Sequence, residues 1–498
     1  MSRRLLRQPF VTVVLGFAAC AEPRGITEPP ILRVGYYVDP AGSSNGDGTW
    51  QRPWDMGTAL AGAAGQIRPG DTVWLRGGRY RGPFTSKLSG TPTAPIFVRQ
   101  YPGERATLDN SSTTQVTLHI TGQWGWYWGF EVMNSISDRN TARPNGVYPS
   151  APNNKLINLV VHDNSIGVSF STESPNSEIY GCVIYNNGFN DIDGTHGHGI
   201  YAKNDGQYQK LVRDNVVFNQ FRNGIQVFTD SGTEQLKNFL LEGNVWFNNG
   251  TLTSASPSDG NILVGGWVVA DQITVRHDMT YFSPGIAAHN VRIGYSNTLQ
   301  NGTAAVQDNY FVGGNLGLVV GYWDAATITG NVVFGTDKIL AVNNPTLSAQ
   351  VWSDNSYLRN PAATAWSYAG TGYTFAGWQQ ATGYGASDQA LASAPTQPQV
   401  FVRPNLYEAG RANIIVYNWT RQSTVAVDVS GVLRPGDHYE VHNVQDMYGP
   451  AVLSGTYTGG SLQVPMTGVR PPAPIGGSPG APPRTSPDFD VFVLYTTT

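Results

Sequence analysis

The sequence predicts an all-β protein, in which a right-handed parallel β-helix is followed by a small C-terminal β-sandwich. Two internal repeats in the middle of the chain and a fresh alternating pattern after residue 400 support this prediction. The composition agrees, because Gly 58, Tyr 24 and Trp 13 in 498 residues describe a turn-rich and aromatic-rich chain. Only 13% of the residues are charged, the formal net charge is -4, and no basic stripe appears. A nucleic-acid partner is therefore not expected.

The first residues read as a bacterial export signal, which we place at residues 1–20. Arginines precede an apolar run that is too short to span a bilayer. The run ends in Phe17-Ala-Ala-Cys20, which resembles a lipoprotein cleavage box. Membrane attachment through a lipidated Cys20 and ordinary cleavage just after Cys20 or Ala21 both remain open. The mature protein is expected in the periplasm, on the cell surface or in the medium.

The next segment opens with motifs that are rich in glycine and aromatic residues. They are Tyr36-Tyr-Val-Asp-Pro, Pro69-Gly-Asp-Thr-Val-Trp-Leu and Ala94-Pro-Ile-Phe-Val-Arg. These motifs resemble the N-terminal opening of many secreted β-helix polysaccharide lyases, the pectate lyase and chondroitinase B-like superfamily. The resemblance covers roughly residues 35–345, which we predict to be the solenoid. The Ala-rich stretch Trp54–Ile67 is expected to form an N-terminal capping helix.

The first repeat is a polar residue followed by alternating apolar residues, as in Asn215-Val-Val-Phe. Its members recur after about 22 to 34 residues, which suits one coil of a solenoid with variable loops. Asparagines stacked at this position can form a ladder of hydrogen bonds along the coils. Cys182 would fill one rung as a small buried residue, and with two cysteines no disulfide framework is expected. The predicted rungs are Asn158, Cys182, Asn215, Asn244, Asp278, Asn309 and Asn331.

The second repeat is a strand that follows each rung and alternates with period two. Its outward residues define three columns on one face of the solenoid. The first column reads Ser169, Tyr201, Gln226, Leu263, Arg292 and Val319. The second column reads Ser171, Lys203, Phe228, Gly265, Gly294 and Gly321. The third column reads Glu173, Asp205, Asp230, Trp267, Ser296 and Trp323.

The C-terminal part of the chain has a different pattern. Residues 346–400 lose the repeat and are rich in Ala, Ser, Gly and Pro, so they are expected to form a cap and a linker. Residues 401–498 alternate again, with Gly and Pro turns between the runs and a Pro-rich loop at Pro471–Pro487. This predicts a small β-sandwich. It resembles the C-terminal β domains of other secreted β-helix proteins, and nothing in it indicates catalysis.

A long loop with several ionisable residues precedes Tyr201 and Lys203. It contains Asp191, Asp193, His196 and His198. A second long loop covers residues 251–259, so the two loops flank the coil around Gln226, whose own loop is short. Long loops on a solenoid commonly carry its function. The pattern therefore predicts a cleft over this coil.

The acids of the third column indicate a cation site. Glu173, Asp205 and Asp230 would lie about 4.8 Å apart from coil to coil. Three like charges persist when they hold a cation, share protons or are solvated. Because hard cations prefer oxygen ligands, we predict Ca²⁺ at these residues, with Asp191 and Asp193 as further ligands. No organic cofactor is expected.

These residues suggest a lyase that acts on a uronic-acid polysaccharide. β-Elimination requires neutralisation of the substrate carboxylate, abstraction of the C5 proton and protonation of the leaving oxygen. Ca²⁺ could neutralise the substrate carboxylate, and Lys203 or Tyr201 could be the base. Arg222 or His198 could assist. The catalytic candidates are Lys203, Tyr201, His198, Arg222, Asp205 and Asp230. The substrate-binding candidates are Glu173, His196, Gln226, Trp267, Trp323 and Arg292.

The lyases that resemble chondroitinase B place a Lys and an Arg on the same face in adjacent coils. Lys203 matches the Lys in kind. Phe228 occupies the position equivalent to the Arg, and Arg222 lies a few residues earlier. The resemblance is therefore to the class of β-helix lyases rather than to one defined member.

Two other functions remain open. A glycoside hydrolase would use two carboxyl groups, about 5–5.5 Å apart for retention or about 6.5–9.5 Å apart for inversion. Asp205 and Asp230 are the candidates. A non-catalytic adhesin or glycan-binding protein would use Trp267 and Trp323 to stack sugars. In all three cases the expected partner is a polysaccharide, and no protein partner is implied.

Overall fold

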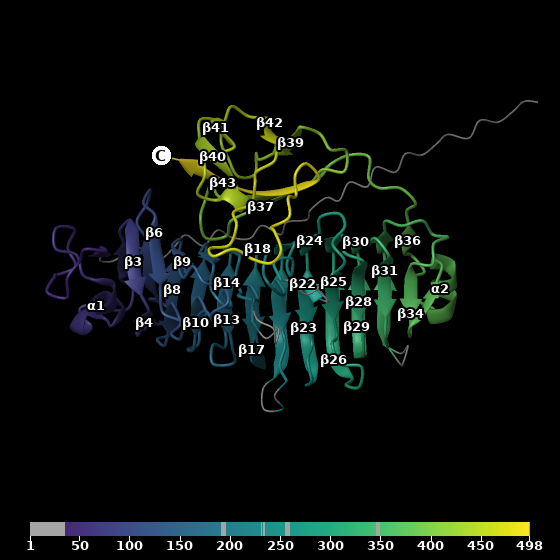
Figure 1. Ribbon diagram of the computed structural model, residues 1–498, viewed down its shortest axis with the longest axis horizontal. Helices are drawn as coiled ribbons and strands as arrows, with labels where there is room; N and C mark the ends of the chain where they lie inside the picture. The colour runs from purple at the N-terminus through teal and green to yellow at the C-terminus, as the bar shows by residue number, and fades with distance from the viewer. Residues whose placement is uncertain are drawn as a thin grey trace, which may run out of the picture.

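Three long sheets form a solenoid whose strands run parallel and stack coil upon coil (Figure 1). The computed structural model describes residues 35–190, 196–230, 232, 235–253, 259–344 and 349–497. We name the sheets A, B and C in the order in which each coil visits them. Adjacent strands are parallel throughout, except for the antiparallel pair at the end of sheet C. The predicted parallel β-helix is confirmed.

Each sheet contains 12 strands. Sheet A consists of β1 (Gly35–Val38), β2 (Thr72–Leu75), β5 (Ile96–Gln100), β8 (Gly125–Trp128), β11 (Lys155–Ile157), β14 (Glu178–Tyr180), β17 (Asn204–Arg213), β20 (Leu236–Glu242), β23 (Ala270–Arg276), β26 (Asn301–Gln307), β29 (Trp323–Thr329) and β32 (Gln350–Ser353). Sheet B consists of β3 (Gly78–Gly82), β6 (Ala106–Asn110), β9 (Glu131–Met133), β12 (Val160–His162), β15 (Val183–Tyr185), β18 (Val216–Phe218), β21 (Val245–Phe247), β24 (Met279–Tyr281), β27 (Tyr310–Val312), β30 (Val332–Phe334), β33 (Ser356–Tyr357) and β36 (Gln389–Ala390). Sheet C consists of β4 (Phe84–Ser86), β7 (Leu118–Ile120), β10 (Val147–Pro149), β13 (Val168–Phe170), β16 (Ile200–Ala202), β19 (Ile225–Val227), β22 (Asp259–Val264), β25 (His289–Ile293), β28 (Leu316–Val320), β31 (Lys338–Val342), β34 (Trp366–Tyr368) and β35 (Thr371–Tyr373).

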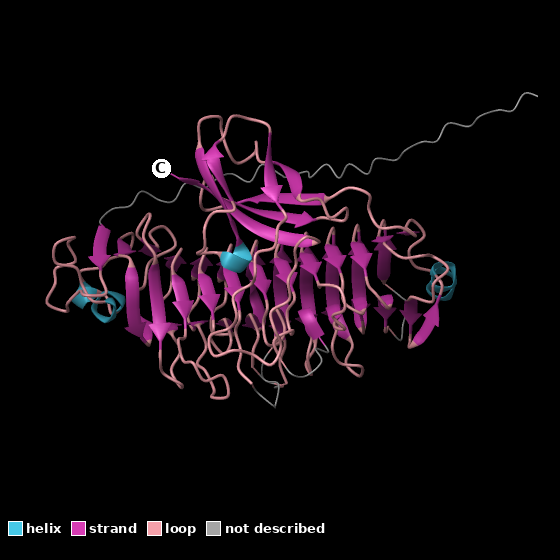
Figure 2. Cartoon of the chain, turned by 45° about the horizontal axis from the view of Figure 1, so that its top comes forward, coloured by secondary structure: helices cyan, strands magenta, loops and turns pink. Residues whose placement is uncertain are grey.

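Short helices close both ends of the solenoid (Figure 2). At the N-terminal end, α1 (Met56–Leu60) and η1 (Ala63–Gly65) fall within the stretch for which a capping helix was predicted. At the other end, α2 (Phe375–Thr382) contributes Trp378 to the core. Strands of all three sheets continue past residue 345, where we expected the solenoid to end, as far as β36. Among the described residues, no helix has the length and hydropathy needed to cross a membrane, and the predicted export signal with Cys20 lies outside them.

The polar ladder lies at the turn between sheets A and B. Asn244 accepts hydrogen bonds from the backbone and side-chain amides of Asn215, and Asp278 accepts the same pair from Asn244. The ladder continues through Asn355 to Asp388. Cys182 occupies a rung and is fully buried.

The first predicted rung is wrong by one residue. Val160 pairs with Val183, so Leu159 is the neighbour of Cys182 and Asn158 falls one position earlier. Asn158 adopts a positive φ of 52° and turns toward the C-terminal domain, where it donates to Glu408 at 2.8 Å. A single shift of register exchanges inward and outward positions. Leu159 therefore joins the core instead.

The C-terminal domain is a sandwich of two antiparallel sheets, as predicted. The larger sheet consists of β37 (Gln399–Pro404), β38 (Ala412–Tyr417), β43 (Phe489–Thr497), β40 (His438–Asn443) and β41 (Leu453–Thr456). The smaller sheet pairs β39 (Thr424–Asp428) with β42 (Ser461–Pro465), and η2 (Val444–Asp446) follows β40. Residues such as Ile414, Val427 and Leu462 form the core between the two sheets.

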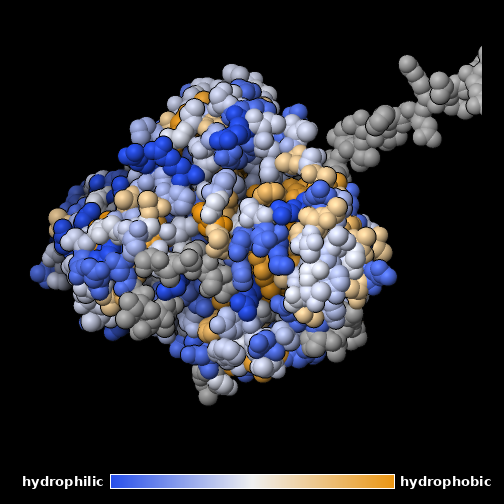
Figure 3. All heavy atoms as spheres, turned by 45° about the vertical axis from the view of Figure 1, so that its right-hand side comes forward, coloured by the Kyte–Doolittle hydropathy of each residue, from blue (hydrophilic) through white to orange (hydrophobic). Residues whose placement is uncertain are grey.

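The other face of the larger sheet packs on the outer surface of sheet B, above the solenoid in Figures 1 and 3. Tyr185, Phe218 and Phe247 stack on one another along sheet B, with ring centroids 5.2 and 4.7 Å apart. Phe489 of β43 packs edge-on against Phe247 at 5.3 Å. Because this contact is apolar and extensive, the domain forms one unit with the solenoid.

A buried charge network lies beside this interface. His162 Nδ1 is 2.7 Å from Asp163 Oδ2, and its Nε2 is 2.8 Å from Glu131 Oε1. Burial disfavours the charged ring, but the two carboxylates outweigh it and raise the pKa of His162 to about 9. Burial likewise opposes ionisation of Glu131, but hydrogen bonds from His162 and Arg105 lower its pKa to about 2.

We expect this network to set the pH dependence of stability. A raised histidine pKa stabilises the fold below its ordinary value, and the contribution is lost as the pH rises through about 9. The lowered pKa of Glu131 stabilises above its ordinary value, and that contribution is lost as the pH falls through about 2. Denaturant unfolding from about pH 6 to 10 should show an alkaline decline on the order of 2–3 kcal/mol. The decline should be absent from His162→Gln, and equal declines in both proteins would contradict the assignment.

Candidate functional site

The exposed face of sheet C carries the first predicted column. Its register pairs Ser169 with Tyr201, Tyr201 with Gln226, Gln226 with Leu263, and Leu263 with Arg292. Tyr201 and its counterparts Gln226 and Arg292 are partly exposed, whereas the flanking residues of each strand are buried. The alternation within these short strands therefore fixes which side chains face solvent.

Three of the predicted catalytic residues contact one another around β16, and the backbone of a fourth, Arg222, lies beside the loop that precedes this strand. The ring of His198 stacks beside that of Tyr201, with centroids 5.8 Å apart. Lys203 Nζ lies 5.1 Å from the centre of the same ring. The backbone amide of Arg222 donates to Gly197 at 2.8 Å, which places the start of the next coil against the loop before β16. A tyrosine, a lysine amine and a buried imidazole are thus brought together at β16, with the backbone of Arg222 beside them.

His196 and Gln226 lie next to this cluster. The ring of His196 packs against Phe189 at 5.2 Å, at the base of the loop before β16. Gln226 is the direct neighbour of Tyr201 in the next coil. Asp191 and Asp193 lie outside the described residues.

The third predicted column does not exist as a column, because the coils turn at different points after sheet C. Asp205 already belongs to β17 of sheet A, where it pairs with Lys237. Asp230 lies in the longer connection that precedes β20, and Glu173 lies in a turn before β14. Strand periodicity extends only as far as the strand, so the register could not be continued past the corner.

Trp323 was predicted to stack sugars, and this is wrong. It opens β29 with its side chain inside the solenoid, and its indole N–H donates to the carbonyl of Ile293 at 3.1 Å. Trp267 is 52% exposed and packs edge-on against Tyr295 at 5.4 Å, with Phe228 at 5.1 Å on the other side of that ring. An aromatic group therefore follows sheet C in the coils after β16.

Lys210 is a site residue that the sequence analysis missed. It is buried beneath the turn that carries Glu173, and its Nζ donates to the carbonyls of Phe170 and Ser171 and to Ser174 Oγ. Burial lowers the pKa of Lys210 well below its ordinary value, while the negative charges of Glu173 and Asp205 oppose the shift. The sequence feature that could have indicated its burial is its position in β17, because Lys210 lies two residues before the buried Val212 and so shares its inward face.

Two of the predicted calcium ligands, Asp191 and Asp193, lie outside the described residues, and the other three, Glu173, Asp205 and Asp230, lie in a turn, a strand and a loop. Within the ranges that the structure describes, no group of three or more His, Cys, Asp or Glu side chains is placed to hold a metal ion. Burial opposes ionisation of Glu173, but hydrogen bonds that include those from Ser171 and Tyr148 outweigh it and lower the pKa of Glu173. The residues of the third column thus do not fit a Ca²⁺ ion.

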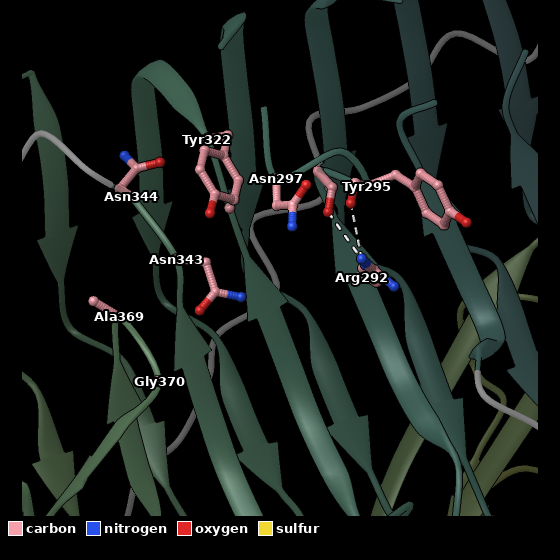
Figure 4. Close-up of a pocket in the computed structure, with 10 residues that line it drawn as sticks. Arg292, Tyr295, Asn297, Tyr322, Asn343, Asn344, Ala369 and Gly370 are labelled. Carbon is pink, nitrogen blue, oxygen red and sulfur yellow. Dashed lines mark hydrogen bonds between the residues drawn. The ribbon is translucent and has the colours of Figure 1, made fainter. Parts of the chain in front are cut away.

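A pocket of about 500 Å³ opens further along the solenoid, at the turns from sheet C to sheet A (Figure 4). Arg292 forms one wall, held by the backbone carbonyls of Gly294 and Tyr295 at 3.3 and 2.8 Å. Its remaining lining residues are Gly294, Tyr295, Asn297, Gly321, Tyr322, Asn343, Asn344, Ala369 and Gly370.

The fold and this face together define a right-handed parallel β-helix protein with partly exposed polar side chains along sheet C. Residues 36–315 match the family described as "Pel9A-like, right handed beta helix region", and the chain belongs to that family. It is 25% identical over 378 residues to "Pectate lyase PEL9" of Emericella nidulans, covering 66% of this chain and 87% of that protein. It is 26% identical over 319 residues to "Pectate lyase L" of Dickeya dadantii, covering 55% and 69%.

Solved structures show the same fold at low identity. The lacto-N-biosidase of Eubacterium ramulus superposes with a TM-score of 0.50 at 14% identity, over 72% of this chain and 68% of that chain. The shared fold carries no information about the reaction.

Proposed function

We propose that the protein is a polysaccharide lyase that cleaves a uronic-acid-containing chain by β-elimination. The observation that carries the proposal is the contact of Lys203 and the buried His198 with the ring of Tyr201 at β16, with the backbone of Arg222 against the loop that precedes this strand. Membership of the Pel9A-like family and similarity to two proteins named pectate lyases support it. Pectate is a polyuronate, so the proposed substrate class agrees with those names.

The proposed mechanism uses only side chains of this face. Arg222 pairs with the substrate carboxylate, which makes the C5 proton more acidic. Lys203 takes that proton, the electron pair forms the C4–C5 double bond, and the C4–O bond breaks. Tyr201 donates a proton to the leaving oxygen. His198 packs against Tyr201 and positions its ring.

A panel of polysaccharides tests the proposal. Pectate, alginate, chondroitin sulfate and a neutral glycan are incubated with the protein, and two signals are followed. A lyase produces ultraviolet absorbance from the unsaturated uronyl product, on at least one acidic polymer. Release of reducing ends without that absorbance would indicate a hydrolase, and binding without either signal would indicate a glycan-binding protein.

We expect metal removal to leave turnover within about twofold of the untreated rate, since in the proposed mechanism the guanidinium of Arg222 supplies the positive charge that neutralises the substrate carboxylate. The measurement compares initial rates before and after dialysis against EDTA, then after addition of Ca²⁺. The dialysed protein should also keep its Tm, which excludes unfolding as a cause of any change. A large loss that Ca²⁺ restores would contradict this expectation and would assign a metal site to the loop that contains Asp191 and Asp193.

A further inference from the structure

A run of glycines interrupts the second column of sheet C and creates the pocket. Phe228 is followed in successive coils by Gly265, Gly294 and Gly321. A Cβ atom at Gly294 would lie 2.0 Å from the carbonyl oxygen of Gly321, so no other residue fits there. The floor of the pocket is therefore bare backbone, in line with the face that carries Lys203.

The walls of the pocket present the groups that bind sugars. Figure 4 shows the amides of Asn297 and Asn343 and the ring of Tyr322 around the opening, while the ring of Tyr295 points away. Arg292 is the only charged residue among those that line it. Amides and an aromatic ring with a hydroxyl suit the hydroxyl groups and faces of a pyranose, and a guanidinium suits a carboxylate.

The backbone conformation of Tyr322 determines where its ring lies. Its φ of 60° lies in the left-handed region, where a bulky side chain is unfavourable. Its carbonyl accepts a hydrogen bond from the amide of Asn301 at 2.6 Å, a contact that glycine would make equally well. Trp124 has a similar φ of 57° directly before β8, so this conformation belongs to the turn into sheet A and holds the Tyr322 ring in place at the pocket.

We propose that this pocket is a distal subsite for a uronic acid unit of the substrate, an inference that rests on the proposed function. In register, Arg292 is three coils from Tyr201, or about 14 Å along the solenoid axis. A pyranose unit advances a polysaccharide chain by about as much as one coil. A chain that lies along sheet C from Lys203 therefore reaches the pocket with its third unit beyond the cleaved linkage.

Tyr322→Gly separates binding from structure. A merely structural role predicts a lower Tm, whereas the left-handed backbone of glycine predicts a Tm equal to or above that of the wild type. We expect the KM for a hexameric uronate to rise about tenfold with kcat unchanged. This is the result for a contact that binds the substrate equally in the ground state and in the transition state. The KM for the shortest oligomer that is still cleaved should not change, because that oligomer does not reach the pocket.

Gly321→Leu tests the same subsite by filling it. A Cβ at Gly321 would meet only the Cβ of Asn343, at 3.4 Å, so a larger side chain enters the pocket without a backbone clash. We expect the same length-dependent rise in KM. Gly431→Leu is the matched control, because Gly431 is exposed in the C-terminal domain with open space around it.

The outcomes separate this inference from the proposed function. A wild-type protein that cleaves uronates, with both pocket variants unchanged or impaired equally at every oligomer length, overturns the subsite alone. A wild-type protein that cleaves no uronate overturns the proposed function. In that case calorimetry with the hexamer decides the subsite, which requires weaker binding to Gly321→Leu than to Gly431→Leu.

Discussion

Replacing Lys203 by alanine should reduce kcat on a uronate polymer by at least about a hundredfold, the usual contribution of a general base. The Tm should stay within about 2 °C of the wild type, because the side chain is partly exposed and leaves the core unchanged. Tyr201→Phe, which removes only the proposed proton donor, should give a loss of similar size. Rates are measured from the ultraviolet absorbance of the product, and stability by thermal unfolding.

Lys237→Ala provides the matched control for Lys203. Lys237 is another partly exposed lysine, on neighbouring sheet A, where it pairs with Asp205. Its loss should leave kcat unchanged. Full activity of both Lys203→Ala and Tyr201→Phe would place the active site elsewhere on the solenoid.

The largest effect on stability is expected from Arg139. Its side chain is 1% exposed and forms an ion pair with Asp163. It also donates to the carbonyls of Asn186 and Ile475 at 3.3 and 2.7 Å, and Ile475 belongs to the Pro-rich loop of the C-terminal domain. Arg139→Ala leaves the buried Asp163 carboxylate with His162 as its remaining charged partner, and breaking a buried ion pair typically costs about 3–5 kcal/mol.

Denaturant unfolding measures this loss, with Arg52→Ala as the control. Arg52 forms an exposed pair with Asp47, in which the side chains are 64% and 45% accessible. Such a pair contributes at most about 1 kcal/mol. If Arg139→Ala were no less stable than Arg52→Ala, the contacts of Arg139 with Asp163 and Ile475 would not stabilise the attachment of the C-terminal domain to the solenoid.

The parts of the fold that depend on strand periodicity could be predicted from the sequence. Alternation within β16, β19 and β25 placed Tyr201, Gln226 and Arg292 in one column, and their observed register is the predicted one. The ladder from Cys182 onward was found in the same way, because each rung directly precedes a strand of sheet B. Both features repeat with the coil, so several coils determine the register together.

The turns between strands could not be predicted, because nothing in them repeats. Asp205 lies in a strand of sheet A, whereas Asp230 lies in a loop. The third predicted column, which assumed that both continue the strands of sheet C, was therefore wrong. Trp323 was placed outside for the same reason. Sheet A was missed because its strands begin at different distances after sheet C. The burial of Lys210 was missed for the same reason, because Lys210 lies at an inward position of a sheet A strand.

The attachment of the C-terminal domain also lay beyond sequence reasoning. It depends on contacts between residues that are far apart in the chain, such as Tyr407 with Glu178 and Asn405 with Asn158. Each polar residue alone is typical of a surface loop. Only the fold brings them together.

The central claim, cleavage by β-elimination on sheet C, is tested most directly by the fate of water in the reaction. A uronate polymer is digested in water enriched in heavy oxygen, and the mass of each product is measured. Elimination adds no water, so the account predicts an unsaturated uronyl end and no heavy oxygen beyond the amount that a control oligomer exchanges at its reducing end without the protein. Heavy oxygen at the new chain ends, with saturated sugars on both sides of the break, would show hydrolysis and contradict the account.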